Sequence, residues 1–297
     1  MRVFVTGATG FVGSAVVQEL LSAGHQVLGL ARSDASAQLL IDAGAEVHRG
    51  DLEDLDSLKQ GAASTDGTIH TGFIHDFTRF KEVCEVDRRA IEALGESLKG
   101  TNKPLLVTSG SALLPAGQLG TENDKRNPNS PNPRETEQAA DALAEQGIRV
   151  AVVRLPPSVH GEGDHGFVPI LINIAREKGI SVYKEEGKNV WPAVHRLDAA
   201  KVFRLGIEKN PEPGTRYHAI AEGGIPFKQI AEVIGKRLNV PVVSKPTEEA
   251  NAHFDWFAHF AAFDNPASSK QTQEQLGWSF NQPGLIEDID NDYYFSV

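Results

Sequence analysis

Three regularly spaced glycines near the start of the chain could form a site for phosphate groups. Gly7, Gly10 and Gly13 lie between Arg2–Thr6, which predicts a short buried strand, and Val12–Ser22, whose apolar residues have helical spacing. In such a turn the first glycine allows the tight bend, the second lets the backbone approach a pyrophosphate, and the third lets the helix pack on the strand. The N–H groups and dipole of the helix N-terminus attract phosphates. The alternative is a glycine-rich turn without a ligand. We expect a dinucleotide, bound by Thr6, Gly7, Thr9, Gly10, Phe11, Val12 and Gly13.

The residues after the next two predicted strands indicate which dinucleotide is bound. The strand at Gln26–Ala31 is followed by Arg32 and Ser33, and no acidic residue occupies positions 30–33 to bind a ribose 2′-hydroxyl. A cation and a hydroxyl suit a 2′-phosphate, so we expect NADP(H). The alternative is that Arg32 is solvated, or stacks on adenine while NAD(H) binds. After the third strand, Asp51 and Leu52 are expected at the adenine, although Asp51 can also cap the next helix.

The chain as a whole alternates strand and helix patterns in its first half. Such alternation predicts an α/β fold, a doubly wound parallel sheet of the Rossmann type. After Arg154 the pattern loosens into a smaller C-terminal substrate-binding lobe. We expect a nucleotide-binding domain at 1–155, with segments near 190–220 returning to it, and a lobe made largely of 156–297. The predicted strands are Arg2–Thr6, Gln26–Ala31, Glu46–His48, Thr68–Thr71, Leu105–Thr108 and Val150–Arg154, with two in the lobe at Ile180–Tyr183 and Arg216–Ile220. The helices predicted after Arg154 are Val168–Lys178, Asp198–Glu208, Pro226–Leu238 and Glu248–Phe263.

Composition excludes several classes of protein. The 297 residues carry 29 basic and 40 acidic side chains, a net charge of −11, so nucleic acid is an unsuitable partner. One cysteine, Cys84, allows neither an internal disulfide nor a cysteine zinc cluster. No apolar run is long enough for a membrane span, and the first residues lack the pattern of a signal peptide. We therefore expect a cytoplasmic protein, a monomer or homodimer. The proline-rich stretch Pro115–Pro133 predicts a long surface loop that borders a site.

These motifs resemble the extended short-chain dehydrogenase/reductase superfamily, the NAD-dependent epimerase/dehydratase type. The resemblance covers almost the whole chain through TGATGFVG at the first turn, GDL at 50–52, IHTGF at 69–73, TSGSA at 108–112, RLPPSVHG at 154–161 and VHRLD at 194–198. It implies a Rossmann domain with a smaller substrate domain, and hydride transfer at a nicotinamide. It adds Thr71, Gly72 and Pro156 to the expected cofactor contacts, with Pro157 beside them.

The chain departs from that superfamily at its active-site pair. The family has Tyr-x-x-x-Lys on the helix after the long loop, where the lysine lowers the pKa of the tyrosine. Here no tyrosine precedes Tyr183, and Pro133 and Glu137 align with the tyrosine and lysine. Glu137 cannot depress the pKa of a phenol by positive charge. The chain therefore resembles the atypical members that lack this pair.

Other side chains must then handle the substrate. Ser111 aligns with the family serine that hydrogen-bonds the substrate carbonyl, and Ser109 is a second candidate; either could instead cap the loop. The proton could come from water or from a histidine, and His75 is the first candidate because it follows the fourth strand. His160, His165, His195 and Tyr183 are further candidates. No histidine spacing favours a metal site, and none is expected.

The aromatic residues of the second half could form an apolar wall for the substrate. Phe254, Phe257 and Ala261 fall on one face of the expected helix, although packing of the small lobe is the favoured interpretation of this segment. Trp191, beside Pro192 and His195, is expected nearer the pocket, and Trp278 in the core. We conclude from the sequence that this is an NADP(H)-dependent oxidoreductase, resembling carbonyl or aldehyde reductases, that acts on a small carbonyl substrate. The alternatives are a non-catalytic NADP(H)-sensing protein, and an epimerase or isomerase.

Overall fold

The computed structural model describes residues 1–126 and 132–296. A seven-stranded sheet with the order β10-β6-β5-β4-β1-β2-β3 forms its centre, and every pairing in this sheet is parallel. This confirms the predicted doubly wound α/β fold. The strands are β1 (Arg2–Thr6), β2 (Gln26–Ala31), β3 (Glu46–Arg49), β4 (Gly67–His70), β5 (Leu105–Gly110), β6 (Val150–Leu155) and β10 (Thr215–His218).

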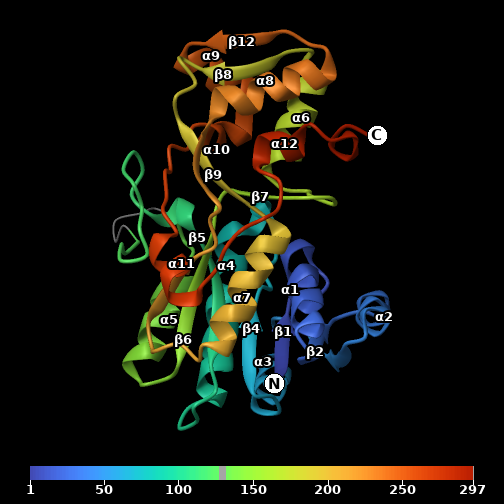
Figure 1. The fold of residues 1–297 in the computed structure, drawn as a ribbon, viewed down its shortest axis with the longest axis vertical. Coiled ribbons are helices and arrows are strands. Elements are labelled where there is room, and N and C mark those ends of the chain that lie inside the picture. Colours follow the sequence, from blue (N-terminus) through green and yellow to red (C-terminus); the bar gives the residue numbers. More distant parts are fainter. Residues whose placement is uncertain (127–131, 297) are drawn as a thin grey trace.

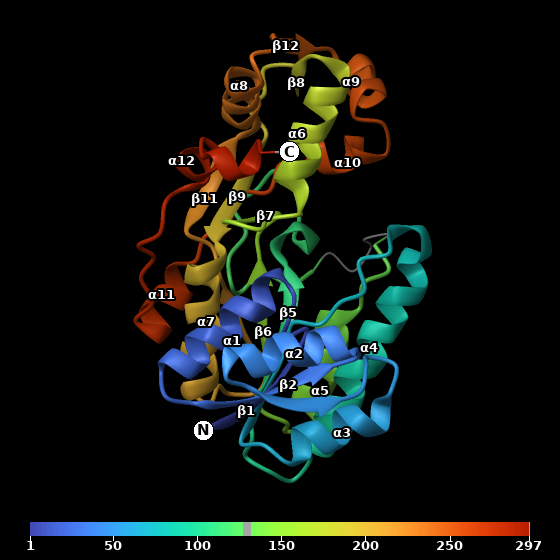
Figure 2. The ribbon, with the colours of Figure 1, turned by 90° about the vertical axis from the view of Figure 1, so that its right-hand side faces the viewer.

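Helices cover both faces of this sheet, which explains the nearly continuous apolar runs of its strands. On β1, Val3 and Val5 point into one core and Phe4 points into the other. The first core is closed by α1 (Phe11–Ser22), α2 (Asp34–Ala43) and α7 (Arg196–Glu208). The second is closed by α3 (Leu55–Ala63), α4 (Phe80–Ser97) and α5 (Thr136–Glu145). Figure 2 shows both layers around the central strands.

A smaller lobe lies beyond the carboxyl ends of the central strands (Figure 1). Its three-stranded sheet has the order β11-β9-β7, and β12 pairs with β8 at its far end. The strands are β7 (Ser158–His160), β8 (Ser181–Lys184), β9 (Val190–His195), β11 (Glu222–Pro226) and β12 (Val242–Lys245). The helices that follow β6, apart from α7, are α6 (Phe167–Lys178), α8 (Phe227–Leu238), α9 (Thr247–Phe254), α10 (Ala258–Ala261), α11 (Lys270–Leu276) and α12 (Leu285–Ile289).

The chain crosses between the two parts several times. Both α7 and β10 return from the lobe to the central sheet, and Trp278 packs in the core beneath α7. The indole Nε1 of Trp278 donates to the backbone oxygen of Asp198 at 3.1 Å. The lobe therefore cannot be cut from the nucleotide-binding part at one position.

Two sequence expectations for these elements were wrong. The helix predicted over Glu248–Phe263 breaks at Asp255, whose φ of 51° cannot continue a right-handed helix. Its aromatic residues are therefore divided among α9, a 3₁₀ turn at Asp255–Phe257 and α10. The fifth strand runs to Gly110, so Ser109 lies within it rather than after it. The strands β7, β9, β11 and β12 were not predicted.

The stretch Pro115–Pro133 contains no helix or strand in its described part, and residues 127–131 lie outside the described residues. It is nevertheless anchored at several points. The side chain of Arg154 donates to the backbone oxygen of Thr121 at 3.3 Å and of Asp124 at 2.7 Å. The carboxylate of Glu122 is buried and accepts from the backbone and hydroxyl of Thr272, both at 2.8 Å. This loop therefore borders the space beyond β5 and β6.

Candidate functional site

The glycine-rich turn has no room for side chains at two of its three glycines. Gly7 has a φ of 65°, and a Cβ placed on it would lie 2.7 Å from the backbone of Gly72. A Cβ on Gly13 would lie 2.0 Å from the backbone oxygen of Gly7. The turn is therefore pressed against the end of β4 on one side and against α1 on the other. A backbone surface without side chains is what close approach of a pyrophosphate requires.

Gly10 leaves the N-terminus of α1 open. It is the N-cap residue, in extended conformation, and no side chain caps the helix there. Its own N–H donates to the oxygen of Gly7 at 2.9 Å, which fixes the turn. The first turn of α1 contains no acidic residue. The backbone N–H groups of Phe11, Val12 and Gly13 are therefore available, in a positive helix-end field, for an anion.

The turn faces the point where the strand order reverses, between β1 and β4. Thr71 donates its hydroxyl to the backbone oxygen of Thr6 at 2.8 Å, and Gly72 donates its N–H to the Thr6 hydroxyl at 3.2 Å. Thr6 also hydrogen-bonds His70, 2.7 Å away. A doubly wound sheet binds ligands at this reversal. Thr6, Thr71 and Gly72 form one bonded unit there and hold the two strand ends together.

The residues expected around the adenosine lie at the ends of β2 and β3. Arg32 is exposed and makes no hydrogen bond or ion pair with the described residues. Ser33 instead caps α2, accepting from the N–H of Ser36 at 3.2 Å. Asp51 uses one oxygen to accept from the N–H groups of Glu53 and Asp54, just before α3, and its second oxygen makes no hydrogen bond with the described residues. The N-cap of α3 is Asp54, which accepts from the N–H of Ser57, so the prediction that Asp51 caps this helix is wrong. Leu52 lies against Gly72.

The helix that aligns with the family's Tyr-x-x-x-Lys holds a buried ion pair instead. Arg154 and Glu137 are almost fully buried and joined by two hydrogen bonds, of 2.7 and 2.9 Å. Burial alone would raise the pKa of Glu137, but the hydrogen bonds and charge of Arg154, with Ser109, lower it below its usual range. The hydroxyl of Ser109 donates to Glu137 at 2.9 Å. Ser109 therefore belongs to this internal network, which favours its structural interpretation.

Ser111 is also buried, at the start of a 3₁₀ turn that follows β5. Its hydroxyl donates to the side-chain oxygen of Asn265 at 2.9 Å. Asn265 comes from the other end of the sequence, and it is only 3% exposed. The donor expected to contact a substrate is therefore occupied by a second polar side chain.

His75 lies in the loop after β4, among aromatic and cationic neighbours. Its ring meets the edge of Phe73 at 5.2 Å, and the guanidinium of Arg134 lies 4.5 Å above the same Phe73 ring. Part of the His75 side chain reaches solvent, but burial of the ring, then the charges of Arg134 and His165, lower its pKa. The neutral imidazole is therefore favoured. His75 therefore carries a proton to donate less often than an ordinary histidine at the same pH.

The lobe contacts the glycine-rich turn directly through Phe11, the first residue of α1. The guanidinium of Arg196, at the start of α7, lies 5.1 Å from the centre of the Phe11 ring. His165, in the loop before α6, meets the same ring edge-on at 5.7 Å. Arg196 and His165 therefore lie beside the expected pyrophosphate site.

His160 and His195 belong to a second buried network. The Nδ1 of His160 lies 2.8 Å from Asp288, and its ring lies 5.4 Å from that of His195. Burial, followed by the charge of His160, lowers the pKa of His195, whose Nδ1 accepts from the backbone N–H of Leu197. The hydroxyl of Tyr294 joins this network at Asp288, 3.4 Å away, and it also lies 3.1 Å from Asp164. These contacts give both histidines structural partners.

The remaining aromatic candidates lie in the lobe. Trp191 is fully buried against Phe167 and Phe227, and its indole nitrogen has no hydrogen-bond partner among the described residues. Phe257 is also fully buried, so the packing interpretation of the aromatic segment is the one its burial supports. Tyr183 lies on β8, at the end of the lobe farthest from the central sheet (Figures 1 and 2).

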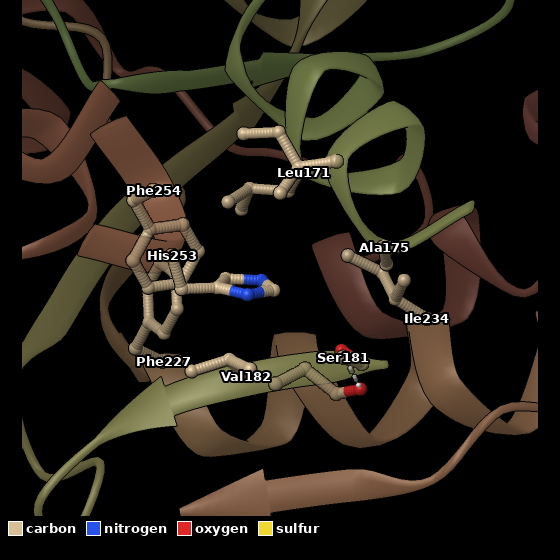
Figure 3. A pocket seen from close by; sticks show the side chains of 10 residues that line it. Leu171, Ala175, Ser181, Val182, Phe227, Ile234, His253 and Phe254 are labelled. Atoms are coloured by element: carbon tan, nitrogen blue, oxygen red, sulfur yellow. Dashed lines mark hydrogen bonds between the residues drawn. The ribbon is translucent and has the colours of Figure 1, made fainter. Parts of the chain in front are cut away.

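A small void lies inside the lobe, lined in part by Phe227 and Phe254. It measures about 10 Å³, close to the lower limit for one water molecule. Figure 3 shows the imidazole of His253 pointing into it, between Leu171 on one side and Val182 on the other. Burial, followed by the charges of Lys178 and Lys245, lowers the pKa of His253 to about 4. The void is too small for a substrate.

Several residues near the site were missed by the sequence analysis. Asn265 gave only the turn signal of an Asn-Pro pair, and nothing in the sequence joins it to Ser111. In the sequence, Arg134 and Arg196 are indistinguishable from ordinary charged residues of the surface. Within the described residues, no group of three metal-binding side chains comes together, and no helix combines the length and apolar character needed to cross a bilayer.

Comparisons with known proteins agree with this geometry. An uncharacterized protein of Schizosaccharomyces pombe is 52% identical over 99% of this chain and 100% of its own length. A 2-alkyl-3-oxoalkanoate reductase of Stenotrophomonas maltophilia is 28% identical over 82% of this chain and 78% of its own. The structure of a dTDP-glucose 4,6-dehydratase of Streptomyces venezuelae, with NAD bound, superposes with a TM-score of 0.76 at 18% identity, covering 98% of this chain and 95% of that one. The family model described as "NAD dependent epimerase/dehydratase family" matches residues 3–219, and the chain belongs to that family.

Proposed function

We propose that this protein is an NADP(H)-dependent oxidoreductase that reduces the carbonyl group of a small, partly apolar molecule. The observation that carries the proposal is the turn at Gly7, Gly10 and Gly13. It has a side-chain-free surface, it opens the N-terminus of α1, and it faces the reversal of strand order. These are the features that a dinucleotide pyrophosphate needs.

The preference for NADP(H) rests on the charge at the ends of β2 and β3. Arg32 is exposed and has no partner among the described residues, so a 2′-phosphate would meet a cation that is free to bind it. The nearby carboxylate of Asp34 is paired with Arg49 at 2.6 Å, which reduces its repulsion of a phosphate. The family model is described as NAD dependent, whereas the charge of Arg32 favours the phosphorylated form in this chain.

The substrate class is inferred from the lobe and from one relative. The lobe meets the nucleotide turn where the ring of His165 packs on Phe11, and the ring of Phe167, two residues farther on, packs on Trp191 in the lobe core. The relative named as a 2-alkyl-3-oxoalkanoate reductase would act on a carbonyl compound with an apolar chain. A partly apolar aldehyde or ketone fits both observations.

The bound cofactor would supply a hydride to the carbonyl carbon. This chain's residues would position the nucleotide through the turn, Arg32, Asp51 and Leu52, and the lobe would hold the substrate beside it. Glu137 is expected where the family has its lysine. Its carboxylate neutralises the charge of Arg154, so the ion pair offers no free positive charge that could activate a tyrosine. We therefore propose water, rather than His75, as the source of the proton.

The test is a turnover assay with purified protein and NADPH. The panel contains p-nitrobenzaldehyde, phenanthrenequinone, acetophenone and an alkyl 3-oxoester, and NADPH absorbance is followed. We expect oxidation of NADPH that depends on at least one panel member and is slower with NADH. Tight NADPH binding without any turnover would overturn the enzymatic proposal. It would favour the NADP(H)-sensing alternative, for which the internally bonded hydroxyls of Ser109 and Ser111 are the supporting observation.

A further inference from the structure

One segment of the lobe is hydrogen-bonded on one side to the lobe sheet and on the other to the loop that follows β5. We call residues 264–268 the crossover segment. On one side, the N–H of Asn265 donates to Val190 at 3.0 Å and that of Ala267 donates to Gly223 at 2.8 Å. On the other side, its backbone accepts from Gly117 and from Gly120, each at 2.8 Å. The crossover segment is therefore fixed between the lobe sheet and the loop that follows β5.

This fixed backbone places the side chain of Asn265 beside Ser111. The amide oxygen accepts the Ser111 hydroxyl at 2.9 Å, and both residues are buried. The amide nitrogen of Asn265 carries two N–H donors, and it makes no hydrogen bond with the described residues. The residue as a whole is only 3% exposed, and these N–H groups are left for water or a ligand oxygen to accept.

The position of this amide connects it to the proposed reaction. Ser111 directly follows β5, whose carboxyl end lies two strands from β1 and its glycine-rich turn. Ligands of doubly wound sheets bind beyond these strand ends. The hydroxyl bond to the amide oxygen also polarises the amide, which strengthens its N–H groups as donors.

We propose that the side-chain amide of Asn265 donates a hydrogen bond to the substrate's carbonyl oxygen, and that Ser111 is the positioning residue that orients this amide. The inference rests on the proposed function. In the overall reaction, the carbonyl carbon gains a hydride from NADPH and the oxygen gains a proton from water, giving the alcohol and NADP⁺. The developing negative charge on that oxygen is what the amide N–H would stabilise.

The decisive comparison uses Asn265→Asp, Asn265→Ala and Ser111→Ala, with the panel member that the unsubstituted protein reduces fastest. Asp at 265 keeps an acceptor for Ser111 and the backbone bonds of the crossover segment, but it has no N–H donor. We expect kcat to fall about 100-fold or more in both Asn265 variants. Ser111→Ala keeps the donor and should lose only about 10-fold. The calorimetric affinity for NADPH and the melting temperature identify variants whose fold is damaged.

A second measurement separates a donor from a purely structural residue. The Raman spectrum of the same carbonyl compound, bound together with NADP⁺, should show its C=O stretch shifted to lower frequency in the unsubstituted protein. In Asn265→Asp the shift should disappear.

Activity and a Raman shift that survive in Asn265→Asp, or a larger loss in Ser111→Ala than in Asn265→Asp, would overturn this inference and leave the proposed function intact. An unsubstituted protein that reduces no panel member would instead overturn the proposed function, and this inference with it.

Discussion

The nucleotide turn and the polar groups behind β5 are built in opposite ways. The turn consists of backbone from eight consecutive residues, and its glycines leave donors facing outward. Behind β5, the side chains of Ser109, Glu137 and Arg154 bond to one another and face inward. The first region is prepared for a ligand, whereas most of the second stabilises the fold. The difference teaches that a position where catalytic side chains are expected can instead hold a buried ion pair.

Gly10→Asp should produce the largest effect, on the first region alone. Gly10 has the extended backbone of an ordinary N-cap, where Asp can cap α1, but a Cβ there would lie 3.2 Å from the backbone oxygen of Gly7, so the turn must shift slightly to admit any side chain. Its carboxylate would repel a pyrophosphate, and we expect NADPH affinity to fall on the order of 1,000-fold, about 4 kcal/mol. Calorimetry and melting temperature measure the two quantities. Gly10→Asn, which has the same shape without the charge, should lose less; equal losses in the two variants, or none, would contradict an anion site.

Glu137→Gln should affect the second region in the opposite sense. It leaves the Arg154 guanidinium buried without its counter-charge, so we expect a loss of about 3 kcal/mol in the free energy of unfolding, measured in urea. Glu135→Gln is the control, because that exposed carboxylate lies 3.6 Å from Arg88 and should cost less than about 1 kcal/mol. If the free energy of unfolding fell by the same small amount in both variants, the network behind β5 would not stabilise the fold.

His253→Leu tests how a buried ionisable group outside the Glu137–Arg154 network changes the pH dependence of the free energy of unfolding. Because folding lowers the pKa of His253 to about 4, the folded state resists a proton that the unfolded state accepts near its ordinary value. Its contribution to stability is present above that ordinary value and is lost as pH falls toward 4. From pH 7 to pH 5 we expect about 2 kcal/mol of loss from this group.

The leucine variant should lack that part of the pH dependence. His259→Leu, which removes an exposed imidazole on neighbouring α10, should retain it. Parallel pH curves for the unsubstituted protein and His253→Leu would contradict the assignment.

Arg32→Glu should give the smallest effect. It tests whether the nucleotide site distinguishes NADPH from NADH through Arg32. We expect NADPH affinity to fall about 10-fold more than NADH affinity, about 1.4 kcal/mol, because only NADPH carries the 2′-phosphate. Calorimetric titration of the same variant with both cofactors supplies its own control. Equal losses would show that Arg32 does not recognise that phosphate.

These two regions also explain what the sequence could predict. The central sheet and the turn follow from local patterns, since Gly7 and Gly13 act within eight consecutive residues and the strands alternate regularly with helices. The pairing of Ser111 with Asn265 spans 154 positions, and that of Glu122 with Thr272 spans 150. Contacts between residues so far apart in the chain leave no pattern in the local sequence, so they could not be predicted. The helix predicted over Glu248–Phe263 failed for a different reason, because its apolar spacing gave no sign of the backbone reversal at Asp255.

The central claim is that the turn after β1 holds a phosphorylated dinucleotide. Calorimetric titration of the purified protein with NADPH, NADP⁺, NADH and NAD⁺ tests it most directly. We predict one site per chain, with the two phosphorylated forms binding more tightly than the others and raising the melting temperature. Absence of heat and of any melting shift with all four compounds would contradict the account.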